Sequence, residues 1–301
     1  MTGYDVTIFG IKMHLNPVAF RIPLGENGWD IYWYGIIIAC GFLLALIFAM
    51  KNAERFHLNT DKMLNVVLIA TPVSILSARA YYVIFDGEKL NGIGDFFGFG
   101  DSSGFAGLAI YGGVIGAFAA GLIACKIFKI NILDMFDIAV LGFLIGQGVG
   151  RWGNFFNQEA YGTFTGNTWW GMTSSKIASE MGSNGLVHPC FLYESIWCIL
   201  GFFVINHLSK KRRFSGETSL MYCVWYGFER TFLELIRTDS LMIGRLRVSS
   251  LLSAVLCITG AVLLAVFEKK YRGESESTEY TPVIAAENDG NLQEEENEQD
   301  N

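Results

Sequence analysis

The chain has 301 residues, of which 51% are hydrophobic and only 17% are charged, and its mean hydropathy is +0.35. This composition excludes an ordinary soluble domain, because the apolar residues form blocks of about 20, the length at which a helix crosses a bilayer. The net charge of −7 comes from the acidic residues after position 273, where the chain has no Lys or Arg. We therefore expect an integral membrane protein with no nucleic-acid partner.

The apolar blocks predict an all-α membrane protein with seven transmembrane helices. Residues 1–31 mix polar and apolar side chains and include Pro17 and Pro23, which indicates an interfacial segment. The helices are expected at about residues 32–50, 63–85, 106–128, 134–152, 188–208, 217–237 and 248–267. Residues 153–187 are rich in Gly, Asn, Thr, Ser and Trp and predict a small external head segment within the catalytic domain 32–267. Residues 268–301 lack an apolar pattern and predict an acidic, disordered tail.

Basic residues between the predicted spans set the orientation. They concentrate in the connections on one side, at Lys51, Arg55, Lys62, Lys126, Lys129, Lys210, Lys211, Arg212, Arg213, Lys269, Lys270 and Arg272. Fewer lie in the connections on the other side. Since cytoplasmic loops carry the excess of Lys and Arg, the N-terminus is expected outside and the C-terminus, with its tail, in the cytoplasm.

This orientation assigns a depth to the polar residues inside the spans. In the outward-running second, fourth and sixth spans they come late, at Arg79, Arg151, Arg230, Glu234 and Arg237. In the inward-running first, third and fifth spans they come early, at Tyr34, Tyr111, His188, Tyr193 and Glu194. Ionisable residues within a membrane usually have partners and mark a site. The sequence therefore predicts one polar cavity that opens towards the outer leaflet.

An arginine-rich cavity suits an anion. Guanidinium stays charged and binds phosphate through two parallel hydrogen bonds, and the abundant anion of a membrane is a phospholipid headgroup. Structural alternatives exist for several residues: Arg79 and Arg237 lie near span ends and could snorkel to the surface. Tyr34 could belong to an aromatic belt, His188 could simply start a helix, and a Gly-Gly pair in the third span could serve packing.

Residues 150–162 are the hardest to explain by packing, because they place Arg151, Asn154, Asn157 and Glu159 at the end of an apolar span. Their pattern, Gly-Arg-x-Gly-Asn-Phe-x-Asn-x-Glu, resembles the prolipoprotein diacylglyceryl transferases and is highly specific. The resemblance continues in the right order along the chain, at Trp33-Tyr34-Gly35, Arg79 with Tyr81-Tyr82, Gly112-Gly113, His188-Pro189 through Tyr193-Glu194, and Arg230 through Asp239.

The resemblance implies an enzyme of the bacterial plasma membrane. Members of this family move the diacylglyceryl group of phosphatidylglycerol onto the lipobox cysteine thiol in the signal peptide of a prolipoprotein and release glycerol phosphate. They use no metal and no cofactor. The arginine that matches Arg151 contacts the phospholipid, and the arginine that matches Arg230 is essential.

Carried onto this sequence, the resemblance implies catalytic roles for Arg151, Arg230 and Tyr111. The expected substrate-binding residues are Arg151, Tyr34, Arg79, Asn154, Asn157, Glu159, Gly162, His188, Tyr193, Glu194, Glu234 and Arg237. One departure matters, because many members have His at the position of Tyr111, and that His has been considered a base. A phenol with a pKa of about 10 is a poor base unless arginines lower the value. Tyr111 is therefore either a tuned base or a hydrogen-bonding group, and the second reading fits a thiol that already ionises to a few per cent.

The main rival is a transporter of an anionic lipid or metabolite that uses the same arginine-lined cavity without covalent chemistry. Transporters often contain internal repeats, and none is evident here. A non-catalytic scaffold that recruits partners through its tail is a second rival, but it leaves Arg151 and Arg230 unexplained.

Overall fold

The computed structural model describes residues 3–23, 28–86, 96, 109–238, 242–243 and 246–274. Most of the expected acidic tail, residues 275–301, lies outside this range. The chain divides into two compact units. The first combines Met1–Ala49 with Asp137–Asn301, and the second is Met50–Phe136.

A long helix occupies each predicted span within the described residues. These helices are α1 (Trp33–Asn52), α2 (Thr60–Asp86), α4 (Ile110–Ile127), α5 (Ile132–Asn157), α7 (Cys190–Leu208), α8 (Glu217–Ile236) and α9 (Val248–Glu274). Six of these described helices are long and apolar enough to cross a membrane, and α8 is not among them. Helix α8 contains Glu217, Glu229, Arg230 and Glu234, which lower its hydropathy. The helical membrane class is thus confirmed.

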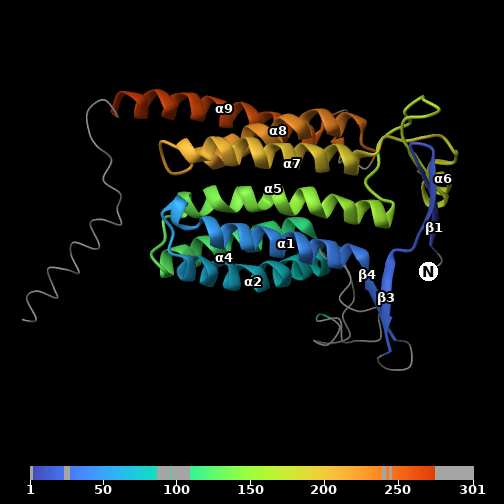
Figure 1. Ribbon diagram of the computed structural model, residues 1–301, viewed down its shortest axis with the longest axis horizontal. Coiled ribbons are helices and arrows are strands. Elements are labelled where there is room, and N and C mark those ends of the chain that lie inside the picture. The colour runs from blue at the N-terminus through green and yellow to red at the C-terminus, as the bar shows by residue number, and fades with distance from the viewer. Residues whose placement is uncertain are drawn as a thin grey trace, which may run out of the picture. The chain divides into compact units, whose positions relative to one another are not determined.

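The membrane helices expose apolar side chains on their surfaces. Ile38, Leu43 and Leu44 of α1 are exposed, as are Leu252 and Ile258 of α9. Long apolar helices with exposed apolar faces are stable in lipid, where every backbone polar group is satisfied within the helix. In the first unit, α8 packs against both α7 and α9 (Figure 1).

Two helices, α5 and α9, extend by a turn or more beyond their predicted ends. Helix α5 continues to Asn157 instead of ending at residue 152, because Phe155 is buried and anchors the additional turn. It stops where Gln158 and Ala160 adopt positive φ angles of 50° and 56°, a conformation that interrupts an α-helix. Helix α9 continues to Glu274 instead of residue 267, where unbranched charged residues favour helix.

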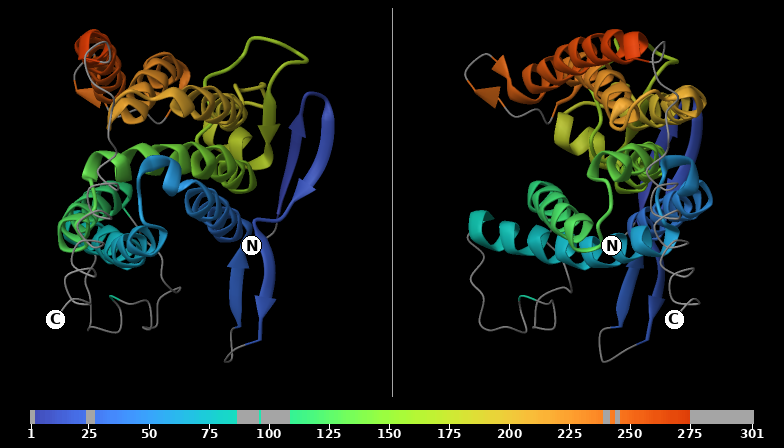
Figure 2. Two further views of the ribbon diagram at one scale, coloured as in Figure 1. Left: turned by 60° about the vertical axis from the view of Figure 1, so that its left-hand side comes forward. Right: turned by 90° about the vertical axis from the view of Figure 1, so that its left-hand side faces the viewer.

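The N-terminal segment forms strands that belong to the head. Strands β1 (Tyr4–Ile8) and β2 (Ile11–Leu15) form an antiparallel hairpin, and β1 also pairs with β5 (Met172–Ser174). Figure 2 shows this hairpin, in blue, beside the yellow-green strand of the head. Ser174 then caps α6 (Ser175–Met181) by accepting a hydrogen bond from Ile177 N. The head is therefore built from two segments that are distant in the sequence.

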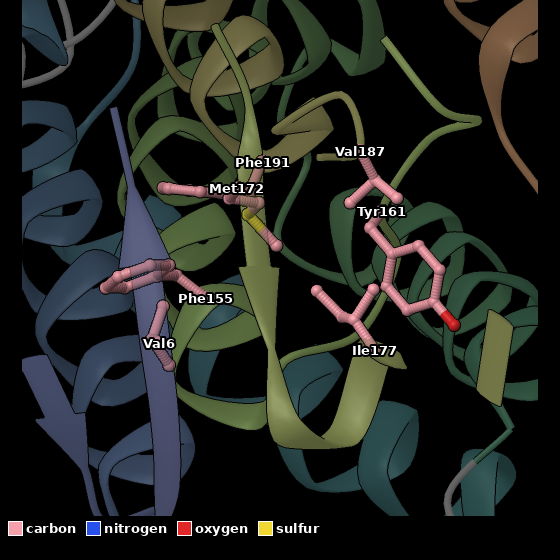
Figure 3. Close-up of a cluster of buried hydrophobic side chains, with 7 residues drawn as sticks. All are labelled: Val6, Phe155, Tyr161, Met172, Ile177, Val187 and Phe191. Carbon is pink, nitrogen blue, oxygen red and sulfur yellow. The ribbon is translucent and has the colours of Figure 1, made fainter. Parts of the chain in front are cut away.

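A buried apolar cluster joins the head to the helix ends. Its members are Val6, Phe155, Tyr161, Met172, Ile177, Val187 and Phe191, and Figure 3 shows them around the strands of the head. Phe155 comes from the end of α5 and Phe191 from the start of α7, and their rings stack with centroids 4.7 Å apart. The cluster thus holds the polar ends of α5 and α7 at a fixed separation.

The remaining strands are short. Strands β3 (Val18–Ile22) and β4 (Trp29–Tyr32) form a second hairpin before α1, and Arg21 pairs with Asp30 across it. This guanidinium holds the pKa of the Asp30 carboxyl below its ordinary value. Strands β6 (Met242–Ile243) and β7 (Leu246–Arg247) form a small hairpin before α9.

In the second unit, α4 packs closely on α2 through glycines. A Cβ at Gly112 would collide with the Ser77 carbonyl oxygen and the Tyr81 side chain, and Ser74 Oγ donates to the Gly113 carbonyl at 2.8 Å. The packing explanation of the Gly-Gly pair is therefore confirmed. Small residues allow such close approach between helices in a membrane.

The start of α8 is capped by a residue of α5. Asp137, which is fully buried, accepts hydrogen bonds from Gly216 N and Ser219 N, each at 2.8 Å, and pairs with Arg212 at 3.0 Å. The first amides of a helix lack intrahelical partners, and Gly216 has no side chain that could supply one. Asp137 supplies it from another helix and sets where α8 begins.

Candidate active site

The centre of the candidate site is the carboxylate of Glu194. This residue lies in the first turns of α7 and is 2% exposed. Its Oε2 forms ion pairs with Arg151 of α5 and with Arg230 of α8, the latter at 3.5 Å. Its Oε1 lies 3.0 Å from Nη1 of Arg237, at the C-terminal end of α8. One buried carboxylate therefore gathers three predicted arginines from two other helices.

Glu234 completes this group, which we call the arginine cluster: Arg151, Glu194, Arg230, Glu234 and Arg237. Its Oε2 lies 2.9 Å from Nη2 of Arg230, one helical turn earlier on α8. Cations outnumber anions within the cluster, as a phosphate site requires. Buried ions are tolerated only when they are paired, and these pairs account for arginines inside an apolar bundle.

The members of the cluster differ in exposure. The side chains of Arg151 and Arg230 are 22% and 18% exposed, whereas that of Arg237 is 8% exposed. Arg151 and Arg230 can therefore reach a ligand while they remain attached to Glu194. Arg237 is enclosed, which contradicts the snorkelling alternative for this residue.

The end of α8 is joined to the segment that follows α5. Gly162 N donates to the His188 carbonyl at 3.0 Å, and Thr163 N donates to the Ile236 carbonyl at 2.7 Å. A Cβ at Gly162 would lie 2.8 Å from His188 Cβ and 3.0 Å from the Ile236 carbonyl oxygen. There is no room for it, so Gly162 acts through close backbone approach.

Arg247 binds the C-terminal end of α8. Its guanidinium donates to the carbonyl oxygens of Glu234 and Arg237, the second at 3.1 Å. The last carbonyls of a helix have no intrahelical donor, and a cation there also complements the helix dipole. Arg247 thus caps the end of α8 that carries the arginine cluster.

A second polar group lies at the end of α5. The Asn154 and Asn157 side-chain amides donate to Glu159 Oε1 at 2.9 and 3.4 Å. Tyr34 interacts electrostatically with Glu159 and Arg151, and its ring lies against Gly153, where a Cβ would be 2.6 Å from Cδ2. Asn154, Asn157 and Glu159 thus form one hydrogen-bonded group, whereas Arg151, from the same stretch, pairs with Glu194.

His188 and Tyr193 form a third group with Trp170. The Tyr193 hydroxyl lies 3.2 Å from His188 Nδ1 and accepts a hydrogen bond of 2.8 Å from Trp170 Nε1. Since Tyr193 and Glu194 are consecutive on α7, this network connects the head to the helix that carries the central carboxylate.

Two predicted residues belong to the other unit. Arg79 is 2% exposed, donates through Nε to the Phe96 carbonyl at 3.1 Å and stacks over Tyr82 at 5.7 Å. Its burial contradicts the snorkelling alternative. Tyr111, in the first turn of α4, is 61% exposed.

Sequence reasoning missed two residues of α8 that approach the cluster. Tyr226 and Glu229 both interact electrostatically with Arg151, Glu194 and Arg230. Glu229 carried a usable signal, because an acid within an apolar helix marks a site. Within the described ranges, no group of three or more His, Cys, Asp or Glu side chains is arranged to hold a metal ion.

The chain is similar to known proteins over most of its length. A family model described as prolipoprotein diacylglyceryl transferase matches residues 17–266. A Clostridioides difficile protein named phosphatidylglycerol–prolipoprotein diacylglyceryl transferase is 40% identical over 254 residues, which cover 83% of this chain and 96% of the relative.

Other relatives carry the same name. A Pediococcus pentosaceus protein is 41% identical over 262 residues, covering 85% of this chain and 91% of its own. A Finegoldia magna protein is 40% identical over 252 residues, covering 83% and 96%. These comparisons give no support to the transporter alternative. The chain therefore belongs to the prolipoprotein diacylglyceryl transferase family and is a membrane transferase of lipoprotein biosynthesis.

Proposed function

We propose that this enzyme transfers the diacylglyceryl group of phosphatidylglycerol to the lipobox cysteine thiol of prolipoprotein signal peptides in the bacterial plasma membrane. Both substrates occur in the names of its relatives. The observation that carries the proposal is the convergence of Arg151 and Arg230 on one buried carboxylate.

The chemistry explains why the reaction needs arginines. The thiol sulfur attacks the glyceryl carbon next to the phosphate oxygen, and the carbon–oxygen bond breaks as the carbon–sulfur bond forms. Glycerol phosphate leaves, and its phosphate moves from one negative charge towards two. Fixed cations at the phosphate therefore bind the transition state more strongly than the ground state. Arg151 and Arg230 supply this charge in the proposed mechanism.

Glu194 would make these cations effective before the lipid arrives. A free arginine side chain has many rotamers, and ordering it at the moment of reaction would reduce the benefit. The ion pairs with Glu194 already fix Arg151 and Arg230, so they are preorganised donors. Arg237 pairs with the other oxygen of Glu194, and Glu234 pairs with Arg230.

The other predicted residues receive supporting roles in this proposal. Asn154, Asn157 and Glu159 bind the glycerol hydroxyls of the headgroup, and Tyr34 covers this group. His188, just before α7, and Tyr193, in its first turn, bind substrate, while Gly162 maintains the backbone junction. Arg79 and Tyr111 keep the roles that the resemblance implies, substrate binding for Arg79 and a hydrogen-bonding role in catalysis for Tyr111.

We also propose the seven-span topology, with α8 as the sixth span, the N-terminus outside and the C-terminus in the cytoplasm. Ion pairing of its charges supports membrane insertion of α8, because paired charges cost less than isolated ones. Residues 1–31 then lie at the outer surface, 32–267 form the catalytic domain with its external head, and 268–301 carry the cytoplasmic tail. Reporter fusions after residues 57, 130 and 211 should all report the cytoplasm, and periplasmic activity at any of them would contradict the topology.

The decisive experiment combines the purified protein with phosphatidylglycerol vesicles and a lipobox peptide. The proposal predicts a thioether-linked diacylglyceryl peptide and glycerol phosphate in equal amounts. A control peptide with Ser in place of Cys should give neither product. Movement of lipid between leaflets without a thioether product would instead identify a transporter.

A further inference from the structure

Glu229 is a carboxylate that the mechanism above leaves unused. It directly precedes Arg230 on α8 and interacts electrostatically with Arg151, Glu194 and Arg230. Its Oε1 is buried and has no hydrogen-bond partner among the described residues. A buried polar atom without a partner is costly and rare, and such an atom requires an explanation.

The two carboxylates of the arginine cluster behave differently. Glu194 binds three guanidiniums, and Glu234 pairs with Arg230. A carboxylate held by a guanidinium is a poor proton acceptor, because protonation would break the ion pair. Glu229 Oε1 accepts no hydrogen bond from the described residues, although Glu229 interacts electrostatically with Arg151 and Arg230.

Glu229 also lines an open pocket of about 380 Å³. The other lining residues are Tyr193, Trp197, Phe228, Phe232, Leu233 and Ile236. Glu229 is the only carboxylate in this described lining, and its neighbours are mostly apolar. A neutral thiol suits such a place, since a cysteine side chain behaves as a small, polarisable hydrophobe.

We propose that the lipobox cysteine enters this pocket and that Glu229 accepts its proton, so that Glu229 is the base of the reaction. The inference rests on the proposed function. The S–H proton passes to the Glu229 carboxylate, the sulfur forms its bond to the glyceryl carbon, and the carbon–oxygen bond to phosphate breaks. The proton then leaves Glu229 for the departing glycerol phosphate or water, which restores the carboxylate.

The expected size of the effect follows from the thiol. With a pKa of about 8.5, about 3% of a free thiol is ionised at pH 7, so complete ionisation by a base gains about 30-fold. Glu229→Gln, which keeps the size and shape of the side chain, should therefore lower turnover by about 10- to 100-fold at pH 7. The ratio of wild-type to Glu229→Gln turnover should fall towards pH 9, because the thiol then ionises in solvent and no base is needed.

A selenocysteine peptide separates a base from a positioning group. Its selenol is already ionised at neutral pH, so it needs no base. The ratio of wild-type to Glu229→Gln turnover should fall to about 1 with this peptide, whereas loss of a positioning contact would keep the ratio high with both peptides. The matched control is Glu268→Gln, because Glu268 is a half-buried glutamate of α9 that pairs with Arg213, and this variant should match wild type throughout.

The outcomes distinguish the base from the overall function. Absence of any thioether product from wild type overturns the transferase function and the base together. An active wild type with an unchanged Glu229→Gln variant, or with a deficit independent of pH and of selenium, overturns the base alone. If Glu229→Gln does not fold, Glu229→Asp serves instead: it keeps a carboxylate and should retain the wild-type pH profile at lower turnover.

Discussion

Glu194 Oε1 binds Arg237, and its Oε2 binds Arg151, so the two oxygens of one carboxylate connect the end of α8 to the end of α5. A single side chain of α7, Glu194, therefore binds arginines at the ends of both α5 and α8. A change at this residue should affect the position of every arginine in the cluster at once.

Glu194→Gln should damage both stability and turnover. Removing one partner of a buried ion pair leaves its cations uncompensated, which typically costs about 3 to 5 kcal/mol. Turnover should fall by at least about 100-fold, because Arg151 and Arg230 lose their preorganisation. Thermal unfolding in detergent and the thioether assay measure the two effects. Glu54→Gln, at an exposed position, is the control, and wild-type behaviour of Glu194→Gln would remove Glu194 from the centre of the site.

Arg151 and Arg230 should not tolerate Lys. Lysine preserves the charge but lacks the planar fork that binds phosphate through two hydrogen bonds while another part of the group binds Glu194. We expect each Lys variant to lose about 100-fold in kcat, and each Ala variant to lose more. Steady-state kinetics with phosphatidylglycerol checks this, provided that size-exclusion profiles are unchanged. An active Arg151→Lys enzyme would show that charge alone suffices.

Gly162→Ala should be destabilising although the change is small. Its Cβ would lie within 2.8 to 3.0 Å of His188, Cys190 and Ile236, and overpacking of this kind typically costs about 1 to 3 kcal/mol. Activity should fall as well, because the junction to Ile236 places Arg237. Gly121→Ala is the comparison, since no atom lies within 4 Å of its new Cβ and Ala favours helix. Equal unfolding temperatures for the two variants would contradict the packing argument.

Asp137→Ala tests a structural role remote from the chemistry. It removes the cap of α8 and leaves Arg212 without its buried partner, so the free energy of unfolding should fall by about 3 kcal/mol or more. In protein that remains folded at low temperature, KM for the lipid should change little. A variant as stable as wild type would show that α8 does not depend on this cap.

Tyr111→Phe distinguishes a base from a hydrogen-bonding group at this position. Loss of one hydrogen bond costs about 1 kcal/mol, so turnover should fall by about fivefold. A near-complete loss that also disappears with a selenocysteine peptide would instead make Tyr111 the base and remove Glu229 from that role.

Local chemistry made much of this protein predictable. The apolar blocks indicated helices at the correct places, because a membrane span needs only length and hydropathy. Arg151, Arg230 and Glu194 could be singled out, since ionisable groups inside such blocks are costly wherever they occur. Helix ends were less predictable: Phe155 extends α5 only because it packs against Phe191, a contact between two helices.

The tertiary structure decided how these residues are partnered. In the sequence, Arg151 stands beside Asn154 and Glu159, and in the structure it binds Glu194, while those neighbours form their own group. Equally, nothing in the sequence indicated the strands in the first 15 residues or the buried Glu229 oxygen that has no hydrogen-bond partner among the described residues. Sequence alone determined which residues are too polar for a membrane. Their partners depend on side-chain directions and helix packing over long sequence separations, and these are set only when the chain folds.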